Sequence, residues 1–248
     1  MTLHPDFLTR PIAHRGLHQP GIPENSLAAF RAAIDAGYAI ECDIQPAADG
    51  TAMVFHDYDL KRLCGADGFV NQQSPEALAQ TRLLDTDETI PTLAQILALV
   101  AGRTPLLIEI KDQDGRLGPD IGDLQDRVAA LLVDYHGPVA VMSFNPHTTA
   151  AFHKAAPEIA CGLTSCHFPA DDWPMLGADQ RARLADLADY TSSGSCFISH
   201  QHTDLTNPAV ARIKAAGGVI LCWTIRSPES EANARQIAQN ITFEGYLA

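Results

Sequence analysis

The feature that most constrains the fold of this chain is an alternation, repeated from end to end, of a short apolar run and an amphipathic, alanine-rich segment. Short apolar runs are typical of buried strands, and the longer segments place apolar side chains at helical spacing. Strands that alternate with helices indicate a parallel sheet covered by helices. The candidate strands are Ile12–His14, Ala39–Ile44, Thr51–His56, Pro105–Ile110, Val139–Phe144, Ile159–Leu163, Cys196–Ser199, Gly218–Thr224 and Ile241–Leu247.

The number of repeats favours an α/β fold of the (β/α)8 TIM-barrel type over an open doubly wound sheet, because such barrels need about 250 residues. The sequence contains nine candidate strands, one more than such a barrel needs, so one of them is a connecting or capping strand that the sequence does not identify. We expect the first helix to take Asn25 as its N-cap and to end at Gly37. We interpret residues 1–248 as one domain, in which the weakly periodic region 58–90 is a small insertion after the third strand, over the mouth of the barrel.

The composition narrows the classes of partner. An apolar share of 46% with 19% charged residues can support a large core, and a net charge of −13 disfavours binding to nucleic acid or to an anionic membrane. No run approaches the length of a membrane span, and the segment 1–10 lacks the apolar stretch of a signal peptide. The six cysteines show no paired spacing, which favours a reducing compartment and predicts a cytoplasmic protein. The oligomeric state cannot be predicted.

The ionisable residues gather where the predicted strands end. Residues two apart share a face of a strand, so Glu41 and Asp43 point the same way, as do Glu109 and Lys111. Two further strand ends carry His14-Arg15 and His56-Asp57. In a (β/α)8 barrel the carboxyl ends of the strands meet at one mouth, where the active site lies. Taken singly, each of these residues reads better as a packed residue or a salt bridge. Four strand ends that all carry charge by chance are improbable.

The combination of residue types indicates phosphodiester cleavage. Three carboxylates that face one another cannot all stay ionised without a cation, and their oxygens suit Mg2+ or Ca2+ better than zinc. His14 and His56 are then free to act as general acid and base, in an order that the residues leave open. Arg15 and Lys111 can bind a phosphate. We interpret His200 and His202 as loop histidines.

An ordered set of motifs resembles the glycerophosphodiester phosphodiesterase family. The likeness is strongest over residues 12–111 and extends to Ser143-Phe144 and Trp223-Thr224 in the later strands. The motifs are His14-Arg15-Gly16, Pro23-Glu24-Asn25, Glu41-Cys42-Asp43, Asp49-Gly50, His56-Asp57 with Leu60 and Arg62, Ile90-Pro91-Thr92-Leu93 and Glu109-Ile110-Lys111.

The resemblance implies hydrolysis of small-molecule glycerophosphodiesters to glycerol 3-phosphate and an alcohol. It implies a divalent metal on Glu41, Asp43 and Glu109, and proton transfer by His14 and His56. It also implies phosphate binding by Arg15 and Lys111, and packing of Trp223 against the organic part of the substrate.

Three departures from the family pattern concern substrate choice: Cys64 in place of a threonine, Arg226 in place of an asparagine, and Glu244-Gly245-Tyr246 in place of the usual closing segment. Two alternatives stay open. One is a phospholipase D-like cleavage of lysolipids, and the other is a non-catalytic module that binds phosphodiesters.

Overall fold

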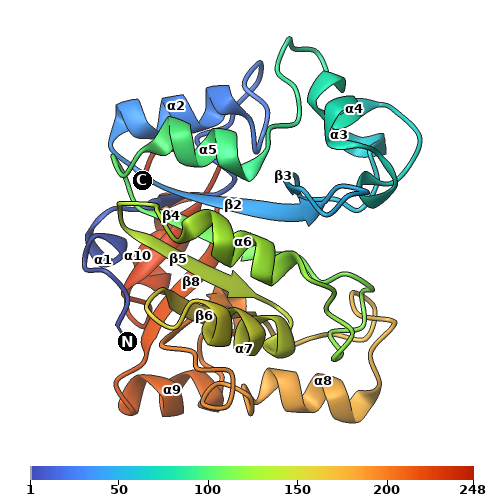
Figure 1. Ribbon diagram of the computed structural model, residues 1–248. Helices are drawn as coiled ribbons and strands as arrows, with labels where there is room; N and C mark the ends of the chain where they lie inside the picture. Colours follow the sequence, from blue (N-terminus) through green and yellow to red (C-terminus); the bar gives the residue numbers. More distant parts are fainter. Residues whose placement is uncertain (1) are drawn as a thin grey trace.

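Eight parallel strands close into a barrel in this computed structural model, which describes residues 2–248. Met1, the first residue of the segment interpreted above as lacking a signal peptide, lies outside the described residues. The ring closes because β1 (Ile12–Ala13) pairs with both β2 (Ala39–Pro46) and β9 (Asn240–Phe243). The others follow in chain order: β4 (Leu106–Ile110), β5 (Val139–Ser143), β6 (Ala160–Ser165), β7 (Phe197–Gln201) and β8 (Val219–Ile225). The predicted TIM barrel is confirmed (Figure 1).

The surplus strand is β3 (Ala52–Val54), which pairs antiparallel with β2 outside the ring. The connection from β2 to β3 passes through Asp49 and Gly50, and Gly50 takes the left-handed conformation with φ +84°. A parallel crossover needs a dozen or more residues, so two strands joined by so short a turn can only run antiparallel. The candidate strand 51–56 is therefore the connecting strand, and it is shorter than predicted.

Helices follow the ring strands and cover the outside of the barrel (Figure 1). They are α2 (Leu27–Ala36), α5 (Leu93–Val100), α6 (Leu124–Leu132), α7 (Pro146–Ala155), α8 (Ala178–Ala185), α9 (Pro208–Ala215) and α10 (Pro228–Ala234). Of these, α5 was not predicted. It starts with a capping box in which Thr92 and Gln95 satisfy each other's backbone N–H groups.

The start of α2 corrects one prediction. The N-cap is Ser26, whose hydroxyl accepts from the N–H of Ala29, and Asn25 lies one residue outside the helix with φ +56°. The side chain of Asn25 is buried and turns into the barrel toward Asp43. The interpretation of Asn25 as a helix cap is therefore wrong. The predicted end of this helix is confirmed, because Gly37 adopts the left-handed C-cap conformation.

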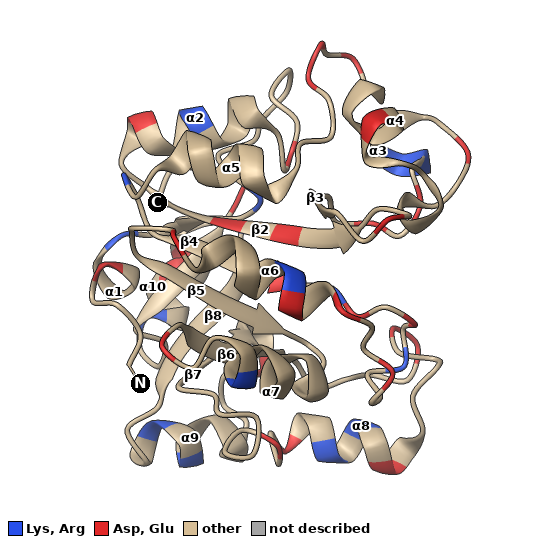
Figure 2. Ribbon diagram, in the orientation of Figure 1, with Lys and Arg blue, Asp and Glu red and all other residues tan. Residues whose placement is uncertain are grey.

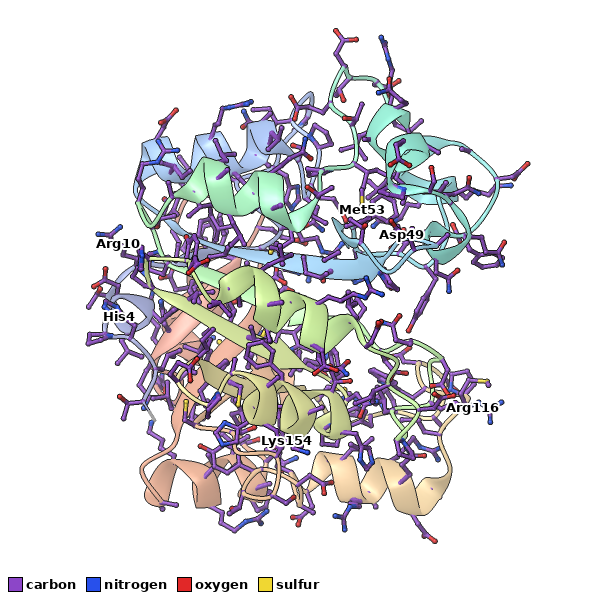
Figure 3. The ribbon with its side chains drawn as sticks, viewed as in Figure 1. His4, Arg10, Asp49, Met53, Arg116 and Lys154 are labelled. Atoms are coloured by element: carbon purple, nitrogen blue, oxygen red, sulfur yellow. The ribbon has the colours of Figure 1, made fainter. Side chains whose placement is uncertain are left out.

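The barrel interior is apolar at one end only. A layer that includes Leu107, Met142, Phe197 and Leu221 fills the ring near the amino ends of the strands. The short helix α1 (Asp6–Thr9) closes that end with the buried ring of Phe7. The larger apolar cluster lies between the outer face of the strands and the helices. With one end plugged, only the carboxyl end of the ring is available for a site. Arg116 marks that side in Figure 3, and His4 and Arg10 mark the opposite one.

The region 58–90 contains more structure than predicted. It holds α3 (Lys61–Cys64), the 3-10 turn η1 (Val70–Gln72) and α4 (Pro75–Gln80), seen apart from the barrel in Figure 1. Its side chains, Leu60, Val70 and Leu78 among them, form a separate apolar cluster that also takes in Met53 of β3. That cluster keeps the segment attached to the hairpin. Its role in shaping a substrate pocket, like the reading of the chain as one domain, stays a prediction.

Within residues 2–248, none of the helices combines the length and apolar character needed to cross a membrane. The predicted cytoplasmic location is untested.

Candidate active site at the carboxyl end of the barrel

Three buried carboxylates converge inside the ring at the carboxyl end. Glu41 and Asp43 lie on β2 and Glu109 lies on β4, where Asp43 and Glu109 are direct neighbours in the parallel register. One oxygen from each carboxylate lies within 4.8 Å of the others. In Figure 2 the ribbon of β2 carries red acidic segments, whereas that of β5 is uncoloured. The alternation of a strand and the pairing of two neighbours thus bring together the three residues that the sequence predicts as metal ligands.

Two cations lie against this cluster. The ammonium of Lys111 is 2.7 Å from Asp43 and also contacts Glu109. The guanidinium of Arg15 lies 3.1 Å from Asp43 and 2.6 Å from Glu24. Burial alone would lower the pKa of Lys111, but the charges of Asp43 and Glu109 hold that pKa above its ordinary value. Both residues predicted to bind phosphate are therefore at the site, where they neutralise carboxylates.

The negative charge is nevertheless unevenly compensated. Burial, and then the charges of Asp43 and Glu109, raise the pKa of Glu41 well above its usual range. The carboxylate of Asp43 shows the reverse: burial would raise its pKa, but Lys111, His56 and Arg15 together hold that pKa far below the ordinary value. Glu41 is thus the member of the cluster that is hardest to ionise without a further cation.

His14 follows β1 and faces the cluster. Its Nε2 lies 4.0 Å from Glu41, and its Nδ1 is 2.5 Å from the carboxylate of Glu244. Burial lowers the pKa of His14, and the hydrogen bond to Glu244 only partly opposes that effect.

The loop after His14 has a required glycine. Arg15 and Gly16 are both left-handed, with φ of 55° and 81°. A Cβ on Gly16 would lie 2.6 Å from the ring of Phe30 on α2. The backbone N–H of Arg15 donates to Glu41 at 3.0 Å. Glycine therefore lets the loop pack on α2 while the backbone of the loop holds a carboxylate of the cluster.

His56 follows the outer strand β3 and is held by its neighbour. Its Nδ1 is 2.7 Å from Asp57, which in turn accepts from Arg62 at 2.7 Å. Arg62 also donates to Glu24, and Glu24 accepts from Arg15. A continuous chain of ion pairs therefore links His56 to the carboxylate cluster. Glu24, Asp57 and Arg62 belong to the motifs quoted above, but residue types alone assign them no contact.

Trp223 lies in β8 and is half-buried among other aromatic side chains. Its indole N–H donates to the backbone carbonyl of Ser199 at 2.9 Å, and its ring packs edge-on against Phe144, 5.7 Å between centroids. Phe168 and Trp173 complete the group. Its predicted contact with the organic part of a substrate stays a prediction.

His200 and His202 are not loop residues, so that interpretation is wrong. His200 lies in β7 and His202 begins the 3-10 turn η2 (His202–Asp204). The buried ring of His200 bonds with Ser165 at 2.8 Å and Asp204 at 3.0 Å. It shares a face with Ile198, which packs in the cluster outside the ring. His200 is therefore a structural residue between barrel and helices.

Comparison with known proteins decides the family. A model of the glycerophosphoryl diester phosphodiesterase family matches residues 14–242, most of the chain. This chain belongs to that family. Two similar proteins are glycerophosphodiester phosphodiesterases of Caldanaerobacter subterraneus subsp. tengcongensis and Bacillus altitudinis. They are 32% and 31% identical over 62% and 61% of this chain. The match spans less than two thirds of each relative, 66% and 64% of their lengths.

Solved structures agree on the fold. A phosphodiesterase of Oleispira antarctica, in complex with the product sn-glycerol-3-phosphate, superposes with a TM-score of 0.76 at 24% identity, covering 96% of this chain and 94% of its own. A glycerophosphodiester phosphodiesterase of Parabacteroides distasonis gives 0.75 at 20% identity, with coverage of 94% and 92%.

Proposed function

We propose that this chain is a metal-dependent phosphoric diester hydrolase that cleaves glycerophosphodiesters to glycerol 3-phosphate and an alcohol. Family membership supports the class of reaction, and the complex of the Oleispira antarctica protein supports the product. The observation that carries the proposal is the cluster of Glu41, Asp43 and Glu109, with His14 beside it. Burying three carboxylates together is costly unless a ligand uses them.

The donor set fits Mg2+ or Ca2+. It consists of carboxylate oxygens only, which hard divalent ions prefer, and the three side chains are already close enough to share one ion. Lys111 contacts Asp43 and Glu109, so positive charge already lies against two of the three carboxylates, which supports the proposal that they bind a cation. When bound, such an ion would neutralise charge on the phosphate.

The histidines would transfer the protons. Each has its Nδ1 occupied by a carboxylate, which leaves Nε2 for the substrate. One would activate the attacking oxygen and the other would protonate the leaving alkoxide. Arg15 and Lys111 would orient the phosphate, and Trp223 would contact the organic part of the substrate.

The test is a panel of glycerophosphodiesters assayed with Mg2+, Ca2+, Mn2+ and a chelator. We expect release of glycerol 3-phosphate that stops when the metal is removed. His56→Ala should lower kcat by about 10²–10⁴-fold. It should still bind ligand, and His4→Ala, at the plugged end of the barrel, should not change turnover.

Three outcomes would refute parts of the proposal. Activity that survives chelation would exclude the metal site. Release of the head group together with the phosphate would mean that the enzyme cleaves the bond on the glycerol side of the phosphate, contrary to the proposal. Ligand binding without turnover in the wild-type protein would identify a binding module, and turnover of lysolipids alone would favour the phospholipase D-like alternative.

A further inference from the structure

The proposed catalytic histidine His14 is held by a pair of residues from the far end of the chain. Its Nδ1 lies 2.5 Å from Oε2 of Glu244, which directly follows β9. The other oxygen of that carboxylate accepts from Arg226, which directly follows β8, at 2.8 Å. The ends of three neighbouring strands, β8, β9 and β1, therefore supply Arg226, Glu244 and His14, which contact one another in that order.

The same arrangement occurs at the other histidine. His56 bonds through Nδ1 to Asp57, and Asp57 accepts from Arg62. In that case the carboxylate is the next residue in sequence. For His14 the carboxylate is 230 positions away and only the closed barrel brings it near. Two imidazoles that serve opposite roles in proton transfer are thus held in one way by unrelated parts of the chain.

We propose that Glu244 is a positioning residue for His14 and that Arg226 fixes the carboxylate of Glu244 in the orientation this requires. The inference rests on the proposed function, since it assigns a role within the same site. An ionised carboxylate only accepts hydrogen bonds, so Nδ1 of His14 must donate. The neutral ring then keeps Nε2, the atom that faces Glu41 and the mouth, as an acceptor.

The surroundings of Glu244 show why a guanidinium is needed. A hollow of about 480 Å3, lined also by His18 and Tyr246, lies beside Glu244, so packing does not fix this side chain on that face. His18 approaches Oε2 at 3.5 Å and competes with His14 for the same oxygen. Burial would raise the pKa of Glu244, but the hydrogen bond from His14, and to a smaller extent the charge of Arg226, hold it below its ordinary value. By donating to Oε1, Arg226 holds the carboxylate with Oε2 turned toward His14.

A purely structural role predicts something different, and the chain offers a matched control. Glu231 and Arg235 on α10 and just after it form another Glu–Arg pair at 2.7 Å, and the Glu231 side chain has the same 19% exposure as that of Glu244. That pair contacts no histidine in the described part of the chain. If the Glu244–Arg226 pair only anchored the chain, Glu231→Ala and Glu244→Ala should therefore have similar effects.

The experiment is a kinetic double-mutant cycle on glycerophosphodiester hydrolysis. We expect Glu244→Ala to lower kcat by about 10²-fold with little change in KM, and Glu244→Gln, which can still accept from Nδ1–H, to recover about tenfold. Arg226→Ala should cost about two- to fivefold, as for an exposed pair. In a His14→Ala background, Glu244→Ala should change kcat less than about twofold, because its effect passes through His14. Glu231→Ala should match the wild type.

A second measurement does not depend on turnover. Nitrogen-15 NMR of the histidine rings reports the tautomer of His14, which we expect to be Nδ1–H in the wild type and to shift toward Nε2–H in Glu244→Ala. A wild type with no activity on any glycerophosphodiester would refute the proposed function but leave this spectrum to decide the contact. The positioning role would be overturned if the losses of kcat caused by Glu244→Ala and His14→Ala multiplied in the double variant. It would also be overturned if Glu244→Ala left the tautomer of His14 unchanged.

Discussion

Replacing Asn25 tests whether its side chain belongs to the site or merely precedes a helix. Its amide donates to Oδ2 of Asp43 at 2.9 Å, and its carbonyl oxygen accepts from the N–H of Asp43 at 3.3 Å. The first bond goes to a charged group, worth about 1.5–3 kcal/mol, and the second adds about 0.5–1.5 kcal/mol. Alanine at φ +56° costs about 1 kcal/mol more. We therefore expect Asn25→Ala to lower the free energy of unfolding by about 3–5.5 kcal/mol.

Two variants separate the contributions. Asn25→Gly loses the same hydrogen bonds but tolerates the left-handed backbone, so it should be about 1 kcal/mol more stable than Asn25→Ala. Ser74 caps α4 by accepting from the N–H of Ala77, and Ser74→Ala should cost only about 1 kcal/mol, as for an ordinary N-cap. Asn25→Ala should also weaken Mg2+ binding, because Asp43 loses the group that orients it.

The assay is urea unfolding with a chelator present, followed by calorimetric titration of Mg2+. A loss for Asn25→Ala no larger than that for Ser74→Ala would refute the reasoning. An Asn25→Gly variant less stable than Asn25→Ala would show that the backbone is not strained at this position.

The remaining predictions concern charge, pH and packing. Mg2+ should raise the melting temperature of the wild type but not that of Glu41→Gln. The metal-free form of Glu41→Gln should be at least as stable as the metal-free wild type, because one of several buried like charges is gone. A Glu41→Gln variant less stable than the wild type under chelation would contradict this. Burial lowers the pKa of His200 although its ring donates a hydrogen bond to Asp204. The unfolded chain therefore takes up the proton first, and stability should fall as pH drops below about 6.5. Urea unfolding across pH 5–8 should show this slope reduced in His200→Gln, and an unchanged slope would refute it. A Cβ on Gly162 would lie 2.6 Å from the backbone oxygen of Phe197, so Gly162→Ala should cost about 1–3 kcal/mol or more in urea unfolding. Gly118→Ala, which meets nothing within 4 Å, should stay within about 0.5 kcal/mol, and equal effects would show that the ring has room.

The periodicity of the chain predicts the barrel because each strand and helix carries its own local pattern. What it cannot assign is the direction of one strand. Residues 51–56 contain a short apolar run like the other candidate strands, and only the short connection through Asp49-Gly50 makes β3 antiparallel. Helix α5 is hard to predict because Ile90-Pro91 directly precedes the capping box that begins at Thr92. Local patterns therefore predict the elements, and the length of a turn decides their direction.

The carboxylates at the site could be predicted, since residues two apart on one strand share a face and neighbouring strands meet at one end. The contacts that hold the histidines could not. Asp57 is adjacent to His56, but which atoms meet depends on rotamers. Glu244 reaches His14 only because the last strand closes the ring beside the first. Asn25 was misassigned because asparagine caps helices often, and its left-handed backbone cannot be recognised from its type.

The charges around the mouth account for where a metal would bind. Of the three carboxylates in the cluster and the three in the networks that hold the histidines, five form ion pairs with arginine or lysine within residues 2–248: Glu24, Asp43, Asp57, Glu109 and Glu244. The sixth, Glu41, has no such ion pair in that part of the chain: His14 lies 4.0 Å away, and Arg15 contacts it through the backbone N–H. Burial, and then the charges of Asp43 and Glu109, raise the pKa of Glu41, and the charge of Arg15 only partly opposes them. A divalent ion beside Glu41 would restore the balance without displacing Arg15, so the unevenness of the pairing favours a metal here more strongly than the number of carboxylates does.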